Sequence, residues 1–104
     1  KEIKDLVKTG QTFFLPEMAI KYKANKEEIT KIGFIVSTKV DKKAVVRNKV
    51  ARHFREVTRE LLPQLKTGYS VLIIAKKRVL ELDFTTIKKQ INFAFEKSRL
   101  YNKG

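Results

Sequence analysis

The chain has 104 residues and a formal net charge of +13, because 24 Lys and Arg stand against 11 Asp and Glu. It has no cysteine, which excludes a disulfide framework and a thiolate metal site. No run of about 18 apolar residues occurs, and the basic segments lack the Trp, Phe and Leu edge of membrane-surface helices, so we expect no membrane partner.

These properties predict a single domain over residues 1–104 that binds nucleic acid. A hydrophobic content of 42% with 34% charged residues is that of a folded protein with a modest core. The excess of cations is typical of proteins that bind nucleic acid. The chain begins with Lys1 rather than Met and shows no signal sequence, so we expect a trimmed N-terminus and a cytoplasmic protein.

The N-terminal third predicts a short helix and two strands. Residues 2–8 place three apolar side chains at helical spacing, and Gly10 follows as a stop signal. After Pro16 a two-residue rhythm predicts a strand whose apolar side carries Met18, Ile20 and Tyr22. Residues 32–37 predict a second strand, and its two sides carry Ile32, Phe34 and Val36 against Gly33, Ile35 and Ser37.

A strongly basic helix is predicted over residues 44–62, ended by Pro63. An arc of roughly 80° gathers its apolar residues, which are Val46, Val50, Phe54, Val57 and Leu61. Nearly opposite, an arc of roughly 60° gathers Asn48, Arg52, Arg55 and Arg59. Glu56 can pair with Arg52 or Arg59, but one carboxylate cannot neutralise this stripe. Because Arg forks onto phosphate oxygens, the pattern favours phosphate-backbone binding over an ordinary solvated face.

The C-terminal part predicts a strand and a helix. Residues 69–75 form a nearly continuous apolar run, typical of a buried strand. The final helix has Asp83 as its cap and a buried stripe of Phe84, Ile87, Ile91, Ala94 and Phe95. The order helix, strands, basic helix, strand, helix predicts an α+β fold, a two-layer sandwich of helices on one small sheet.

Protein-based catalysis is not indicated by the sequence. His53 is the one histidine and stands between Arg52 and Phe54 on the predicted basic helix. The eleven carboxylates are scattered, whereas metal-dependent nucleases gather several around their ions. The four glycines stand singly, so no phosphate-cradling loop is present. We therefore expect neither a self-sufficient nuclease nor a nucleotide hydrolase.

The chain resembles the bacterial ribonuclease P protein subunit over nearly its whole length. The resemblance rests on Ile32, Gly33, Val36, Ser37 and Lys39, on AVVRNKVARHFRE at residues 44–56 and on GYSVLIIA at residues 68–75. It implies a fold like the second domain of ribosomal protein S5, with a left-handed crossover through the basic helix. It also implies a cofactor protein for a catalytic RNA that removes the 5′ leader of precursor tRNA, with Mg²⁺ held mainly by the RNA.

The resemblance implies two binding surfaces and no obligate protein partner. Residues matching the family's RNA-subunit-binding helix are Arg47, Asn48, Lys49, Arg52, Arg55 and Arg59. Residues matching its cleft for the single-stranded leader are Ile3, Val7, Ile20, Tyr22, Ile35, Ser37 and Lys39. The chain departs from the family in having Ile3 and Val7 where Phe is common, and Lys49 in place of an Arg.

Two alternatives stay open. A one-residue change in the register of the first strand would turn Ala19 and Lys21 toward the cleft in place of Ile20 and Tyr22. Separately, the ring of Tyr22 can pack in the core rather than contact the leader. A non-catalytic ribosomal-type RNA-binding module would explain the charge and the fold, but it would not require a leader cleft.

Overall fold

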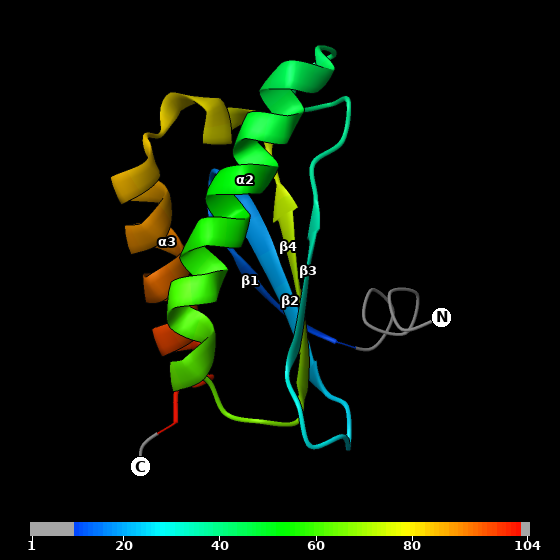
Figure 1. Ribbon diagram of the computed structural model, residues 1–104, viewed down its shortest axis with the longest axis vertical. Helices are drawn as coiled ribbons and strands as arrows, with labels where there is room; N and C mark the ends of the chain where they lie inside the picture. Colours follow the sequence, from blue (N-terminus) through cyan, green and yellow to red (C-terminus); the bar gives the residue numbers. More distant parts are fainter. Residues whose placement is uncertain (1–9, 103–104) are drawn as a thin grey trace.

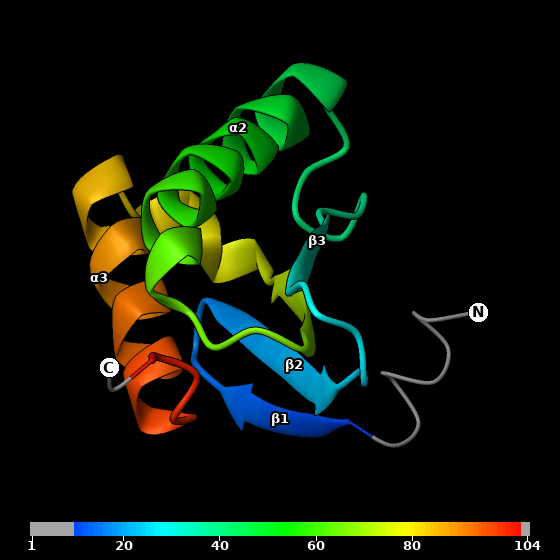
Figure 2. The ribbon, with the colours of Figure 1, turned by 60° about the horizontal axis from the view of Figure 1, so that its bottom comes forward.

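The computed structural model describes residues 10–102, which form one mixed sheet with two helices on one of its faces (Figures 1 and 2). The strands are β1 (Gln11–Phe14), β2 (Met18–Ala24), β3 (Lys31–Ile35) and β4 (Tyr69–Ala75) in the order β1-β2-β4-β3. The helices are α2 (Ala44–Leu61) and α3 (Phe84–Lys97), with short 3-10 helices η1 (Leu62–Gln64) and η2 (Lys77–Glu81). The predicted α+β sandwich is confirmed. The predicted helix at residues 2–8, with Ile3 and Val7, lies outside the described residues.

Strand β1 was missing from the sequence-based prediction. It pairs antiparallel with β2, and Phe13 lies opposite Ile20 while Phe14 lies opposite Ala19. The hairpin closes through the backbone N–H of Leu15, which donates to the carbonyl of Met18 at 2.9 Å, so that Pro16 sits in the turn. The sequence of β1, Gln-Thr-Phe-Phe, does not alternate apolar with polar residues, which explains the omission.

The core lies between the helices and one face of the sheet. Met18 and Ile20 of β2 are fully buried there, as are Ile73 of β4 and Phe54 of α2. Phe34 of β3 lies at the edge of this core, with its ring centroid 5.9 Å from that of Phe54. Burying these large side chains supplies the apolar contacts that hold α2 and α3 against the sheet.

The predicted buried side of α2 is confirmed for four of its five residues. Val50, Phe54, Val57 and Leu61 are buried as predicted, whereas Val46 in the first turn is only half-buried. The helix ends at Leu61, before Pro63, and η1 continues the chain toward β4. Helix α2 connects the parallel strands β3 and β4 and runs down the front of the sheet in Figure 1. Both views show that this connection is a left-handed crossover.

Helix α3 begins at the predicted cap. The Asp83 carboxylate accepts a hydrogen bond from the backbone N–H of Thr86 at 2.8 Å, and this bond is the main cause that lowers the pKa of Asp83. Lys88 of α3 forms an ion pair with Glu60 of α2 at 3.0 Å. Within α2 no cation stands three or four residues from Glu60, so this pair joins the two helices and is not predictable from helical spacing.

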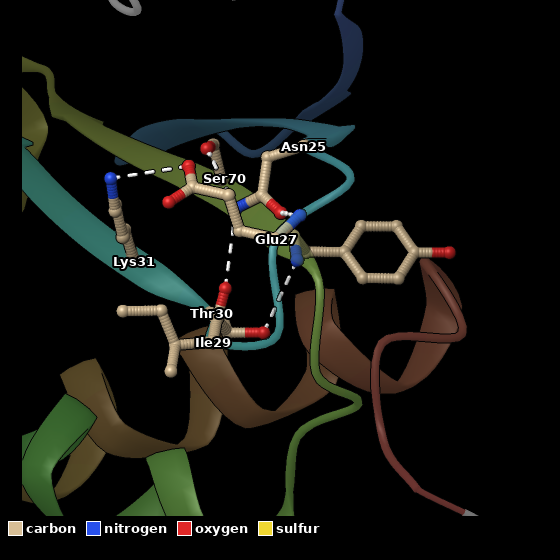
Figure 3. Close-up of polar contacts among 7 residues, drawn as sticks. Asn25, Glu27, Ile29, Thr30, Lys31 and Ser70 are labelled. Carbon is tan, nitrogen blue, oxygen red and sulfur yellow. Dashed lines mark hydrogen bonds and ion pairs between the residues drawn. The ribbon is translucent and has the colours of Figure 1, made fainter.

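The turn between β2 and β3 is held to the start of β4 by polar contacts (Figure 3). The Asn25 amide donates to the Ser70 hydroxyl at 3.2 Å, and its oxygen accepts from the backbone N–H of Glu27 at 2.8 Å. The Glu27 carboxylate lies 3.2 Å from the Lys31 ammonium. The Thr30 hydroxyl donates to the carbonyl of Lys66. These contacts fix the lower end of the sheet as seen in Figure 1.

Candidate nucleic-acid interface

The outward side of α2 carries a row of exposed polar side chains, which we call the arginine face. Its members are Asn48, Lys49, Arg52, Arg55 and Arg59. The opposite side of the same helix is buried in the core, so packing against the sheet fixes which way these cations point. The first turn of α2 contains no acidic residue that would offset the positive charge. The arrangement presents several cations on one side of a rigid element.

Carboxylates neutralise little of the arginine face. The Arg59 guanidinium lies 3.3 Å from the Glu56 carboxylate. Both side chains of this ion pair are exposed to solvent, so the pair is weak. Glu60 is engaged by Lys88 of α3. In the part of the chain that the structure describes, Arg52 and Arg55 have no carboxylate at ion-pair distance. These two side chains are therefore the best placed to bind phosphate.

Arg47 has a different position from the other cations of α2. Its guanidinium Nη1 donates to the backbone carbonyls of Asp41, at 3.0 Å, and Lys42, at 2.8 Å. The Asp41 carboxylate accepts from the backbone N–H of Lys43 at 2.7 Å, which orders the same segment. Arg47 thus braces the approach to the helix, and its contribution to phosphate binding is a prediction that the structure leaves open.

His53 lies at the junction of α2 and α3 rather than in a catalytic cluster. Its ring centroid is 5.5 Å from that of Phe84, in an edge-to-face arrangement. Partial burial lowers the pKa of His53 from its usual value of 6.5, and the cations of Lys49 and Arg52 lower it further. The imidazole is therefore neutral at pH 7 and acts as a packing group.

This lowered pKa predicts a pH dependence of stability. Protonated His53 is disfavoured in the folded chain. The contribution of this histidine to the free energy of unfolding is therefore fully present above about pH 6.5, and it is lost as the pH falls through the pKa of His53 in the folded state. We expect the free energy of unfolding, measured with urea, to decline between about pH 7.5 and 5.5. His53→Gln should flatten this decline, and an equally steep decline in the variant would contradict the assignment.

The two faces of the sheet correct the predicted leader cleft. Ile20 is fully buried beneath the helices, and Tyr22 lies on the same face and packs at the edge of the core. Ile35 pairs with Ile74 and points to the opposite face. The predicted combination of Ile20 and Tyr22 with Ile35 is therefore wrong, because a surface cannot include both sides of a sheet. The alternative register, with Ala19 and Lys21, is the one that shares a face with Ile35.

No described helix covers this second side of the sheet, which we call the open sheet face (Figure 2). Strand pairing places Thr12, Phe14, Ala19, Lys21, Gly33, Ile35, Leu72 and Ile74 on it. Ala19 and Leu72 are buried, and the other six are half-buried or exposed. The Lys21 ammonium donates to the Thr12 hydroxyl at 3.1 Å, which holds the lysine across the strands. Phe14 is 72% exposed, with the Lys76 ammonium 5.6 Å from the centre of its ring. An exposed ring beside cations is the combination that binds single-stranded nucleic acid.

Ser37 and Lys39 lie beyond the end of β3. The Ser37 hydroxyl accepts from the backbone N–H of Lys39 at 3.2 Å, and the backbone N–H of Val40 donates to the Ser37 carbonyl at 3.0 Å. The turn buries Val40 almost completely and leaves Lys39 exposed. Lys39 can therefore reach a ligand that lies along β3, whereas the Ser37 hydroxyl already serves the turn.

The sequence-based reasoning missed Phe14, since it gave no strand to Gln11–Phe14. The only available signal was the pair of aromatic residues between Gly10 and Pro16. Within residues 10–102 no group of three or more His, Asp or Glu side chains is placed to hold a metal ion. Over the same residues no helix is both long and apolar enough to span a bilayer.

Comparisons with known proteins agree on one family. The family model described as Ribonuclease P matches residues 1–99. The ribonuclease P protein component of Caldanaerobacter subterraneus subsp. tengcongensis is 34% identical over 101 residues, which are 97% of this chain and 86% of that protein. The corresponding Fusobacterium nucleatum protein is 32% identical over 95% of this chain and 92% of its own length.

Solved structures show the same fold. The ribonuclease P protein from Staphylococcus aureus superposes with a TM-score of 0.88 at 20% identity, over 97% of this chain and 92% of that chain. The protein from Thermotoga maritima superposes with a TM-score of 0.80 at 23% identity, over 90% and 89%.

Proposed function

Because the chain belongs to the ribonuclease P protein family, whose members serve tRNA 5′ processing as subunits of an endoribonuclease, we propose specific roles for its two surfaces. The arginine face binds the catalytic RNA subunit, and the open sheet face binds the single-stranded 5′ leader of precursor tRNA. The holoenzyme hydrolyses the phosphodiester bond at the mature 5′ end in the cytoplasm.

The observation that carries this proposal is the geometry of α2. Arg52 and Arg55 are exposed on a helix whose other side is fixed in the core, and no described carboxylate pairs with them. A planar guanidinium can donate two parallel hydrogen bonds to a phosphate in this setting. The neighbouring Lys49 adds a point charge, so the face can follow several phosphates of a folded RNA.

The leader has a different chemistry and fits the other surface. Its bases are unpaired and can stack on the exposed ring of Phe14, while Lys21, Lys76 and Lys39 meet its phosphates. Stacking and phosphate contact carry little sequence information, which suits a subunit that must accept many different leaders.

We assign the chemical step to the RNA subunit and its Mg²⁺ ions. In the described residues the one histidine packs against Phe84, and the acidic side chains are dispersed or engaged with lysines and arginines. The protein would support catalysis by placing the leader and by screening the repulsion between the two RNAs.

Cleavage of a 5′-labelled precursor tRNA tests the proposal. Protein alone, a bacterial ribonuclease P RNA alone, and both together are compared at physiological Mg²⁺. We expect accurate cleavage at the mature 5′ end to be strongly stimulated only when both are present. Cleavage by the protein alone would overturn the assignment of chemistry to the RNA. Absence of stimulation, with salt-sensitive RNA binding retained, would favour a ribosomal-type binding module.

A further inference from the structure

A pocket of about 410 Å³ opens beside the end of β2, the start of β4 and the segment after α3, apart from both surfaces described above. We call it the tyrosine pocket, and it is lined by Gln11, Tyr22, Lys23, Ala24, Lys66, Tyr69, Ser98 and Arg99. Tyr22 and Tyr69 reach it from the helix-covered side of the sheet, because Tyr22 pairs with Val71 and Tyr69 precedes Val71 by two residues on the same side.

The pocket is framed by a fixed arrangement of backbone. The N–H of Lys66 donates to the Leu100 carbonyl at 2.7 Å, and the N–H of Asn102 donates to the Gln64 carbonyl at 2.8 Å. Tyr101 packs edge-to-face on Phe95, with ring centroids 6.1 Å apart. The segment after α3 is therefore tied to the segment after α2, which holds Lys66 and Arg99 on one support.

The described residues that line the pocket carry only positive charge. Lys23, Lys66 and Arg99 line it, and no carboxylate of the described residues does. Neither Lys66 nor Arg99 has an ion-pair partner among the described residues. The Ser98 hydroxyl is buried and has no hydrogen-bond partner within residues 10–102. Two cations beside two phenol rings are suited to a phosphate with an unpaired base attached.

The backbone at Arg99 gives an independent indication. Arg99 follows the last turn of α3 with φ of +59°, a left-handed conformation that glycine adopts most easily. The N–H of Leu100 donates to the Phe95 carbonyl at 3.0 Å, so the helix ends in the motif where glycine is common. An exposed arginine at this position strains the backbone, and strain of this kind collects at functional sites.

We propose that the tyrosine pocket binds one nucleotide of single-stranded RNA, with its phosphate between Lys66 and Arg99 and its base against Tyr22 or Tyr69. This third RNA contact deepens the proposed function and rests on it. Two RNAs could supply the nucleotide: an unpaired segment of the catalytic RNA, or the part of the leader distant from the cleavage site.

Arg99→Gly is the decisive variant, because it removes the cation and relieves the backbone strain together. We expect the melting temperature to stay the same or rise, while RNA affinity falls and the slope of log affinity against log salt concentration drops by about one unit. Adding Lys66→Ala should lower the affinity further, because the same phosphate then loses both cations. Lys26→Gly is the matched control, since Lys26 is an exposed cation with φ of +62° outside the pocket.

The source of the nucleotide is read from two titrations. One measures the affinity of the protein for a bacterial ribonuclease P RNA, and the other measures the affinity of the holoenzyme for precursor tRNAs with short and long leaders. A loss confined to the first identifies the catalytic RNA, and a loss confined to long leaders identifies the leader. The wild-type protein is also tested for stimulation of cleavage in the same preparation. A lack of stimulation would contradict the proposed function, and this outcome is distinct from a failure of the tyrosine pocket to bind RNA.

A cation beside a helix C-terminus can also stabilise the helix dipole. That role alone predicts a lower melting temperature for Arg99→Gly with RNA binding equal to that of Lys26→Gly, and this outcome would overturn the proposal. Unchanged affinity and salt slope in the double variant would overturn it as well.

Discussion

Replacing Arg52 and Arg55 together with alanine should abolish most of the affinity for the catalytic RNA. Both side chains are exposed on α2 and lack a described carboxylate partner. A hydrogen bond to a charged group contributes about 1.5–3 kcal/mol, so losing two such contacts should weaken binding by about 100-fold or more. The slope of log affinity against log salt should fall by about two units. Filter binding across a salt series measures both quantities.

The matched control for this pair is Lys77→Ala with Lys89→Ala. These two lysines are exposed on η2 and α3, so the control removes the same net charge away from the arginine face. Alanine preserves helix propensity at all four positions, and both variants should melt within a few degrees of the wild type. Equal losses of affinity in the two variants would mean that net charge, rather than the arginine face, determines binding.

The arginine face was predictable because a helix converts sequence spacing directly into geometry. The apolar residues of α2 repeat with helical period, and their burial fixes the direction of every residue opposite them. What the spacing could not show was contact beyond the helix. Arg47 donates to carbonyls of the preceding segment, and Glu60 pairs with Lys88 of α3. Both contacts depend on how the chain folds back, which periodicity does not encode.

The sheet was less predictable because its two faces differ by one residue of register. The rhythm of Met18, Ile20 and Tyr22 correctly indicated a strand and its apolar side. Deciding which side met a ligand required knowing where α2 and α3 pack, and that information lies in contacts far apart in sequence. The same holds for the tyrosine pocket, since Lys66 and Arg99 are brought together only by the pairing of residues 64–66 with residues 100–102.

The open sheet face depends on an aromatic side chain that the sequence-based reasoning did not assign to any element. Phe14 is 72% exposed at the end of β1, and nothing in the described fold requires a phenyl ring there. A ring with so much of its apolar surface in water contributes little to the stability of the fold, so it is available to a ligand. The position also places it beside Lys76, whose ammonium donates to the Leu15 carbonyl at 2.8 Å and is thereby held near the ring.

Phe14→Ala should therefore weaken binding of precursor tRNAs with long leaders to the holoenzyme. Stacking on an aromatic ring contributes about 1–3 kcal/mol per base, which corresponds to a loss of roughly fivefold to 150-fold in affinity. Affinity for a precursor with a very short leader should be unchanged, and Phe14→Tyr should restore the loss because any aromatic ring can stack. The measurement is the dissociation constant of the holoenzyme as a function of leader length.

Phe93→Ala controls for the loss of an exposed ring. Phe93 is 43% exposed with the Lys97 ammonium 5.6 Å from its centre, so it matches the local chemistry of Phe14. It belongs to α3 and packs edge-to-face on Phe13, at a centroid distance of 6.0 Å, on the helix-covered side of the sheet. A leader on the open sheet face cannot reach it. If Phe93→Ala lowers long-leader affinity as much as Phe14→Ala does, the leader also contacts the helix-covered side of the sheet. The assignment of the leader to the open sheet face would then be wrong.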